Sequence, residues 1–279
     1  MSKELNFAKE LLDFIYESPT AFHAVDSIKK ILDGYGFTEL SEEDRWELKK
    51  GGRYYVIKSH SALTAFVVGN GKLENEGFRI IGAHTDSPTF RIKPAAEMTA
   101  ENYYVKLNTE TYGGPILSTW MDRPLSVAGR VAIKGNDLFS PIIKLVNIRK
   151  PIMIIPNLAI HMNRDVNSGV ELNKQKDMLP LMALINEKLG KGNYLLNTIA
   201  KEVGVEPSDI IDFDLFLYEF EKGTIMGLND EFISSPRLDD LAMVHAGITA
   251  IGNSEISGST NVMVCFDNEE IGRASCRER

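Results

Sequence analysis

His84 and Asp86 are separated by a single residue and follow an apolar segment. In an extended chain, residues two positions apart direct their side chains to the same side. A histidine that binds a metal usually donates its second ring N–H to a carboxylate, so Asp86 is a candidate for the residue that orients His84. Taken alone, the pair is more typical of an ordinary hydrogen-bonded histidine at the end of a strand.

Two acidic pairs occur much later in the chain. Asp239 and Asp240 open a helical pattern, where a carboxylate is favourable to the helix dipole, so simple capping would explain either residue. Glu269 and Glu270 follow a strand pattern. Adjacent residues of an extended segment point in different directions, so one glutamate could bind a metal while its neighbour holds a water.

Considered together, the three clusters indicate a metal site, because separate elements offer nitrogen and oxygen ligands at the same predicted sheet edge. Two metal ions bridged by a carboxylate can polarise a carbonyl group and lower the pKa of the attacking water. The combination therefore predicts a dinuclear, hydrolytic metal site.

The clusters lie beside elements typical of an α/β fold. The segments Phe78–Ala83 and Asn261–Phe266 are predicted to be buried strands, and the first is apolar enough for both of its faces to be covered. Leu238–Ile251 is predicted to be a helix, because its apolar residues recur at helical spacing and Gly252 follows. In α/β sheets, ligands bind beyond the carboxyl ends of the strands, where these clusters lie.

The remaining elements indicate two domains. Helices are predicted over 5–15 and 22–32, and strands over 54–58 and 63–68. From about residue 95 to 232, turns rich in Gly and Pro separate further elements, which we interpret as a second domain inserted into the first. In that insert we expect strands over 103–107, 126–133, 142–148 and 213–220, and helices over 178–188 and 194–203.

The composition excludes several classes of protein. Asp and Glu number 39 against 31 Lys and Arg, so no surplus of cations exists to neutralise a phosphate backbone, and nucleic acid is not an expected partner. The N-terminus lacks the apolar stretch of a signal peptide, and Pro151–Ile160 is too short to span a bilayer. With only two cysteines as well, we expect a cytoplasmic protein without a membrane anchor.

Five ordered motifs resemble the aspartyl aminopeptidase family of dinuclear zinc metalloaminopeptidases: Gly82–Pro88, Trp120–Arg130, Pro156–His161, Ser235–Asp239 and Phe266–Gly272. The resemblance runs from the first helices to about residue 272. It implies a zinc-exopeptidase-like α/β/α sandwich with an inserted β-rich dimerisation domain. It also implies an enzyme that hydrolyses the N-terminal residue of peptides, either an acidic residue or a neutral one.

The same resemblance implies a role for each candidate site residue. His84 binds one metal, Asp239 bridges two metals and Glu270 binds the second. Glu269 is the general base, and Asp86 orients His84. The metals are two zinc ions in the intact site, with cobalt or manganese as possible substitutes.

Domains and assembly follow from the resemblance too. Residues 1–94 and 233–272 correspond to the catalytic domain, and residues 95–232 to the dimerisation domain, whose dimers build a dodecamer. His161 matches a histidine that reaches the active site of a neighbouring subunit. A lone histidine after an apolar run is more often a structural residue, so the sequence leaves both interpretations of His161 open.

The chain departs from the family near its end. The family continues past Glu270 and supplies one further Asp ligand and one further His ligand. We therefore expect a C-terminally truncated chain that is itself inactive, and we interpret residues 273–279 as a non-native tail. Two alternatives stay open: a related dinuclear aminopeptidase or deacylase with another substrate, and a noncatalytic fragment acting only as an oligomerisation or metal-binding protein.

Overall fold

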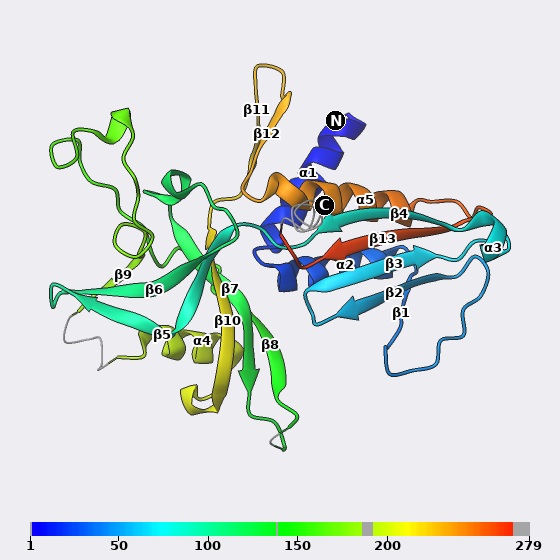
Figure 1. Cartoon of the computed structure of the whole chain (residues 1–279), viewed down its shortest axis with the longest axis horizontal. Coiled ribbons are helices and arrows are strands. Elements are labelled where there is room, and N and C mark those ends of the chain that lie inside the picture. Colours follow the sequence, from blue (N-terminus) through cyan, green and yellow to red (C-terminus); the bar gives the residue numbers. More distant parts are fainter. Residues whose placement is uncertain (1, 138, 186–191, 270–279) are drawn as a thin grey trace, which may run out of the picture. The chain divides into compact units, whose positions relative to one another are not determined.

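The computed structural model describes residues 2–137, 139–185 and 192–269. The chain forms two compact units, the described parts of Met1–Ser87 with Lys222–Arg279, and Pro88–Glu221 (Figure 1). Glu270 and the tail 273–279 lie outside the described residues. Each unit has its own hydrophobic core.

The first unit contains a five-stranded sheet in the order β1-β2-β3-β13-β4. Its strands are β1 (Thr38–Glu39), β2 (Arg53–Lys58), β3 (Ala62–Val67), β13 (Thr260–Phe266) and β4 (Phe78–His84). Strand β13 lies between β3 and β4 and is antiparallel to β3 but parallel to β4, with Phe266 opposite His84. Because the two parallel strands end level, the segments that follow them leave the sheet at the same edge.

Helices α2 (Ala21–Gly34) and α5 (Leu238–Gly252) pack against this sheet, and α1 (Lys3–Glu17) packs on both of these helices (Figure 1). Helix α1 begins where the Ser2 hydroxyl accepts a hydrogen bond from the N–H of Leu5 at 3.2 Å. In β3, burial alternates along the strand, which is the pattern of a sheet with one face on the core. The helices expected over 5–15, 22–32 and 238–251 are thus confirmed. A short helix, α3 (Leu73–Glu76), and the hairpin of β11 (Thr224–Met226) and β12 (Phe232–Ser234) complete the unit.

The expectation that Phe78–Ala83 is buried on both faces is wrong. In β4 the side chains of Phe78, Ile80 and Ile81 are 56%, 65% and 51% exposed. Within the described residues β4 is the edge strand of its sheet and has β13 as its only strand neighbour. A continuous apolar run indicates that a segment prefers burial, but neighbouring elements decide whether both of its faces are covered.

The second unit is built on an antiparallel six-stranded sheet in the order β8-β7-β10-β5-β6-β9. The strands are β5 (Thr89–Ala100), β6 (Tyr104–Tyr112), β7 (Leu125–Ile133), β8 (Ile142–Asn147), β9 (Leu181–Leu184) and β10 (Ile210–Glu219). Helix α4 (Tyr194–Val203) packs on this sheet, and single turns of 3-10 helix occur at Leu117–Trp120, Val166–Ser168 and Pro207–Asp209. In the core, the ring of Trp120 meets that of Phe90 edge to face.

The helix expected over 178–188 is wrong where the structure describes it. Leu181–Leu184 forms strand β9, which pairs with β6, and residues 186–191 lie outside the described part. Pairing with an available sheet edge outweighs the helical spacing of a short apolar run. The other predicted strands and helices of this unit are confirmed within a few residues.

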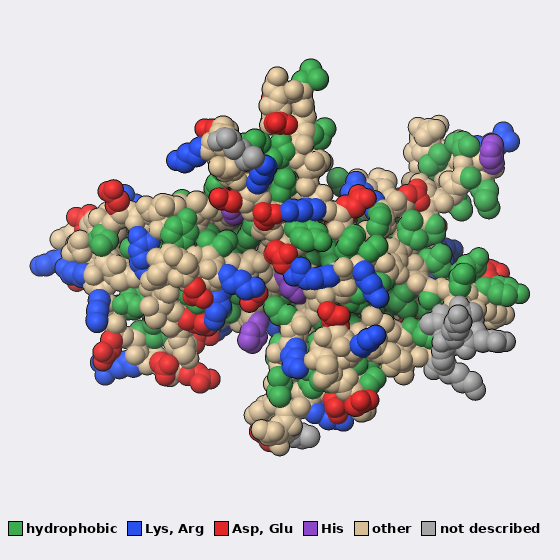
Figure 2. All heavy atoms as spheres, turned by 180° about the vertical axis from the view of Figure 1, so that it is seen from behind, with side chains coloured by type: hydrophobic (Ala, Val, Ile, Leu, Met, Phe, Trp, Pro, Cys, Tyr) green, Lys and Arg blue, Asp and Glu red, His purple; other side chains and the backbone are tan. Residues whose placement is uncertain are grey.

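Two further observations concern the distribution of surface charge and the hydrophobicity of the helices. On the face drawn in Figure 2, Asp and Glu side chains are interspersed with Lys and Arg side chains. Among the described residues, no helix combines the length and the apolar character that crossing a membrane requires.

Candidate metal centre

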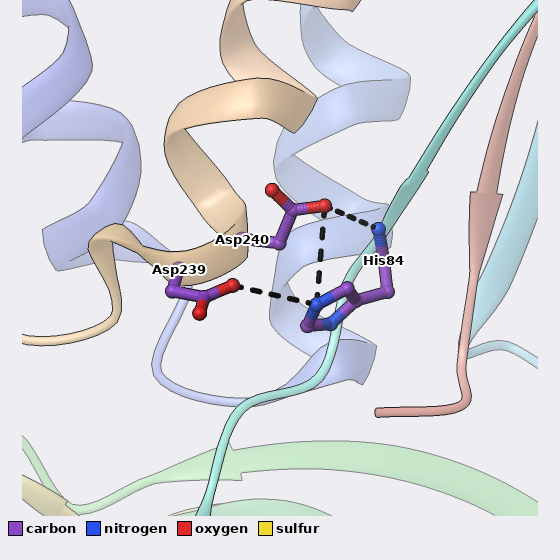
Figure 3. Close-up of side chains that lie close together, drawn as sticks. All are labelled: His84, Asp239 and Asp240. Atoms are coloured by element: carbon purple, nitrogen blue, oxygen red, sulfur yellow. Dashed lines mark hydrogen bonds and ion pairs between the residues drawn. The ribbon is translucent and has the colours of Figure 1, made fainter. Parts of the chain in front are cut away.

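Three segments of the first unit meet where β4 and β13 end. His84 is the last residue of β4, Asp239 and Asp240 stand at the start of α5, and Glu269 follows β13. One ligand atom each from His84, Asp239 and Asp240 lie within 4.8 Å of one another (Figure 3). Within the described ranges this is the one group of three or more His, Cys, Asp or Glu side chains so arranged.

The two carboxylates approach the imidazole of His84 from α5. The Nε2 atom of His84 lies 3.6 Å from Oδ1 of Asp239 and 3.9 Å from Oδ2 of Asp240. Two ligand atoms that share one zinc ion at about 2.0–2.2 Å lie at most about 4.4 Å apart. Both spacings fit a shared ion, and the set of one imidazole nitrogen with carboxylate oxygens suits zinc.

Asp239 and Asp240 are adjacent, but their side chains differ in exposure and in hydrogen bonding. The side chain of Asp240 is 17% exposed, and its Oδ2 accepts a hydrogen bond from the backbone N–H of His84 at 3.0 Å. The side chain of Asp239 is 95% exposed, so its carboxylate is open to solvent. Neither residue has helical backbone angles, and Arg237 occupies the N-cap position without a side-chain capping bond. The hydrogen bond that Asp240 accepts comes from β4 and not from the first turn of α5.

Asp86 lies on the opposite side of the imidazole ring. Nδ1 of His84 is 3.0 Å from the backbone carbonyl oxygen of Asp86 and 3.4 Å from its carboxylate Oδ1. Since a carbonyl oxygen can only accept, Nδ1 carries the proton, and Nε2 is the nitrogen that a metal would use. Asp86 is 5% exposed, and its Oδ2 accepts a hydrogen bond from the backbone N–H of Glu269 at 2.7 Å.

The local electrostatics favour a positive charge at His84. The hydrogen bond with Asp86 raises the pKa of His84 to about 9, against the opposing effect of burial, and Asp240 adds to the rise. Burial also raises the pKa of Asp240. An environment that stabilises a protonated imidazole attracts a divalent cation for the same reason.

The structure brings together part of the predicted site. His84, Asp86, Asp239 and Glu269 lie around one end of the sheet in the first unit. His161 is exposed in a turn of the second unit, and Glu270 lies outside the described residues. Sequence reasoning considered Asp240 only as a possible cap, although its adjacency to Asp239 is the signal that could have marked it as a second cluster member.

Fold and site together define an α/β protein with a candidate metal centre. A family model described as "Aminopeptidase I zinc metalloprotease (M18)" matches residues 14–278, so the chain belongs to the M18 family of zinc metalloproteases. The resemblance of the five sequence motifs to zinc aminopeptidases is thereby confirmed.

Known proteins and structures agree with this assignment. The chain is 62% identical over 275 residues to "Probable M18 family aminopeptidase 2" of Clostridium novyi, and the match covers 99% of this chain and 64% of that protein. A chain of the cryo-EM structure of the Ape4 and Nbr1 complex is 36% identical with a TM-score of 0.89, covering 95% of this chain and 55% of that one. The S. cerevisiae mApe1 dodecamer gives 30% identity and a TM-score of 0.76, with 95% and 61% covered. The α/β fold predicted from the sequence is confirmed.

The neighbouring aspartates give a stability test. Asp240→Ala leaves the N–H of His84 without its acceptor, so we expect the free energy of unfolding to fall by about 1–3 kcal/mol. Asp239→Ala removes an exposed carboxylate and should change the free energy of unfolding by less than about 0.5 kcal/mol. Denaturant unfolding in the presence of a chelator measures both variants. Equal losses in the two would contradict this description of the cluster.

Proposed function

We propose that this protein is a metal-dependent aminopeptidase that hydrolyses the N-terminal residue of peptides. The observation that carries the proposal is the cluster of His84, Asp239 and Asp240 in a chain of the M18 family. The chain spans 64% of the length of the Clostridium novyi relative, which is named as a probable M18 family aminopeptidase. Acidic N-terminal residues are the first substrates to test and neutral residues the second.

In this proposal the cluster binds two zinc ions, for which cobalt or manganese can substitute. His84 would hold one ion through Nε2, Asp239 would be shared between the two, and Glu270 would hold the second. When bound, the ions polarise the peptide carbonyl and lower the pKa of the attacking water. The exposure of the Asp239 carboxylate supports the bridging role, because a bridging ligand must reach ions on both sides.

Two acidic residues of the chain would position and move protons. Asp86 keeps the Nδ1 proton of His84 in place, which leaves Nε2 for metal binding. Glu269 accepts a proton from the attacking water as the general base. The hydrogen bond from the Glu269 backbone to Asp86 supports this role, because it ties the segment that carries the base to the segment that carries the ligand.

We further propose that the second unit mediates self-association into dimers and a dodecamer, and that His161 acts at the active site of a neighbouring subunit. The dodecameric state of S. cerevisiae mApe1 supports assembly, and the exposure of His161 leaves its side chain accessible to another chain.

Metal dependence is the primary test of the proposed function. We expect full-length protein to contain two equivalents of divalent metal, to lose peptidase activity in chelator and to regain it with zinc. Metal analysis and hydrolysis of N-terminal aspartyl, glutamyl and leucyl peptides measure these properties. Metal-free protein with undiminished activity in chelator would refute the proposal.

The adjacent glutamates should differ in phenotype. Glu269→Gln removes the base but no ligand, so we expect metal content to stay and turnover to fall by about 100-fold or more. Glu270→Gln weakens the second metal site and should lower metal content. Each variant controls for the other, and equal metal loss in both would overturn the assignment of Glu269 as the base.

Subunit mixing tests the role of His161. Oligomers of His161→Ala and of Glu269→Gln should each be inactive, whereas mixed oligomers contain some sites with both wild-type residues and should recover part of the activity. Exchange is followed with differently tagged subunits, and Asn163→Ala from the same loop serves as an active control. Confirmed exchange without recovered activity would exclude a role for His161 across the interface.

A further inference from the structure

A second cavity, distinct from the metal centre, lies among the helices of the first unit. It has a volume of about 400 Å³ and is lined by residues of α1, α2 and α5. Pockets for small molecules typically measure about 300–1,000 Å³, so this one has room for a compact ligand. None of His84, Asp86, Asp239 and Asp240 lines it.

The cavity contains a buried histidine with unused hydrogen-bonding capacity. His245 of α5 lines the cavity and is 5% exposed. The rings of Phe7 and Phe14 lie 4.8 Å and 5.5 Å from its ring, and its Nδ1 has no hydrogen-bond partner in the described part of the chain. Buried polar groups are nearly always hydrogen-bonded, so an unpaired one beside a cavity indicates a missing partner.

The charges around this histidine are mostly negative. Three carboxylates of α1 line the cavity, those of Glu10, Asp13 and Glu17, and Asp13 is paired with Lys222. Lys30 also lines it but is paired with Asp26 at 2.7 Å. Glu10 forms no ion pair with any described residue, and its charge counteracts the effect of burial, which lowers the pKa of His245. A neutral imidazole keeps one nitrogen as an acceptor.

The rest of the lining is apolar or aromatic apart from the hydroxyl residues Ser27 and Thr249. Phe14, Ile31 and Tyr35 form walls against which a hydrocarbon or ring can pack. A bare metal ion does not fit, because the only set of three ligand side chains found among the described residues is that of the metal centre. The carboxylate of Glu10 disfavours an anion at this end of the cavity.

We propose that this cavity binds a small organic cation, a primary ammonium group on an aromatic or branched aliphatic body. The ammonium group lies between the carboxylate of Glu10 and the imidazole of His245, where it donates hydrogen bonds to both. The body packs on Phe14, Ile31 and Tyr35. The proposal is independent of the peptidase activity, because no residue of the metal centre takes part.

Binding of tyramine by the full chain, followed by calorimetry and ligand-observed NMR in chelator, tests the proposal. We expect 4-ethylphenol, which lacks the ammonium group, to bind at least tenfold more weakly than tyramine, and 3-(4-hydroxyphenyl)propionate not to bind. Glu10→Gln should weaken tyramine binding about tenfold, whereas Glu4→Gln, an exposed glutamate on the same helix, should leave it unchanged. His245→Phe keeps an aromatic ring but removes the acceptor and should also weaken binding.

Three results would overturn the proposal. Equal affinity for tyramine and 4-ethylphenol would show that the charge is not recognised. Tyramine binding that persists unchanged in Glu10→Gln would show that the ligand binds elsewhere. Equal losses of tyramine affinity in Glu4→Gln and Glu10→Gln would show that only the net charge of the protein matters. Since Glu10 is exposed, its variant is expected to fold even if His245→Phe does not.

Discussion

The parallel pairing of β13 with β4 sets the position of the candidate ligands of the metal centre. The register places Phe266 opposite His84, so the chain leaves both strands at the same edge. Asp86 and Glu269 are 183 positions apart in sequence, yet the backbone of one donates to the carboxylate of the other at 2.7 Å. A shift of one residue in this pairing would turn His84 to the other face of the sheet and separate it from Asp239.

Two hydrogen bonds from backbone N–H groups connect α5 and the segment after β13 to the end of β4 and the residues that follow it. Asp240 accepts from His84, and Asp86 accepts from Glu269, so a partly buried and a buried carboxylate hold the segments while the exposed Asp239 stays available. The arrangement has an electrostatic consequence, because the acidic groups around His84 raise its pKa to about 9. A site that attracts a proton this strongly is suited to a divalent cation once Nε2 is deprotonated.

Much of this architecture could be predicted from the sequence. Helices α1 and α2 were predictable because their apolar residues recur at helical spacing and the pattern stops at Ser18 and Gly34. The exposure of β4 was not, because an apolar run does not reveal which neighbours cover it. Nor could the sequence show that Asp240 binds the backbone of His84, since that depends on the non-helical backbone at the start of α5.

The central claim is that His84 and Asp239 bind a common metal ion. Anomalous diffraction at the zinc absorption edge, from crystals of the zinc-loaded full-length protein, tests it most directly. The account predicts an anomalous peak about 2.0–2.2 Å from both Nε2 of His84 and a carboxylate oxygen of Asp239. Zinc-loaded, active protein whose anomalous peaks all lie away from these two side chains would contradict it.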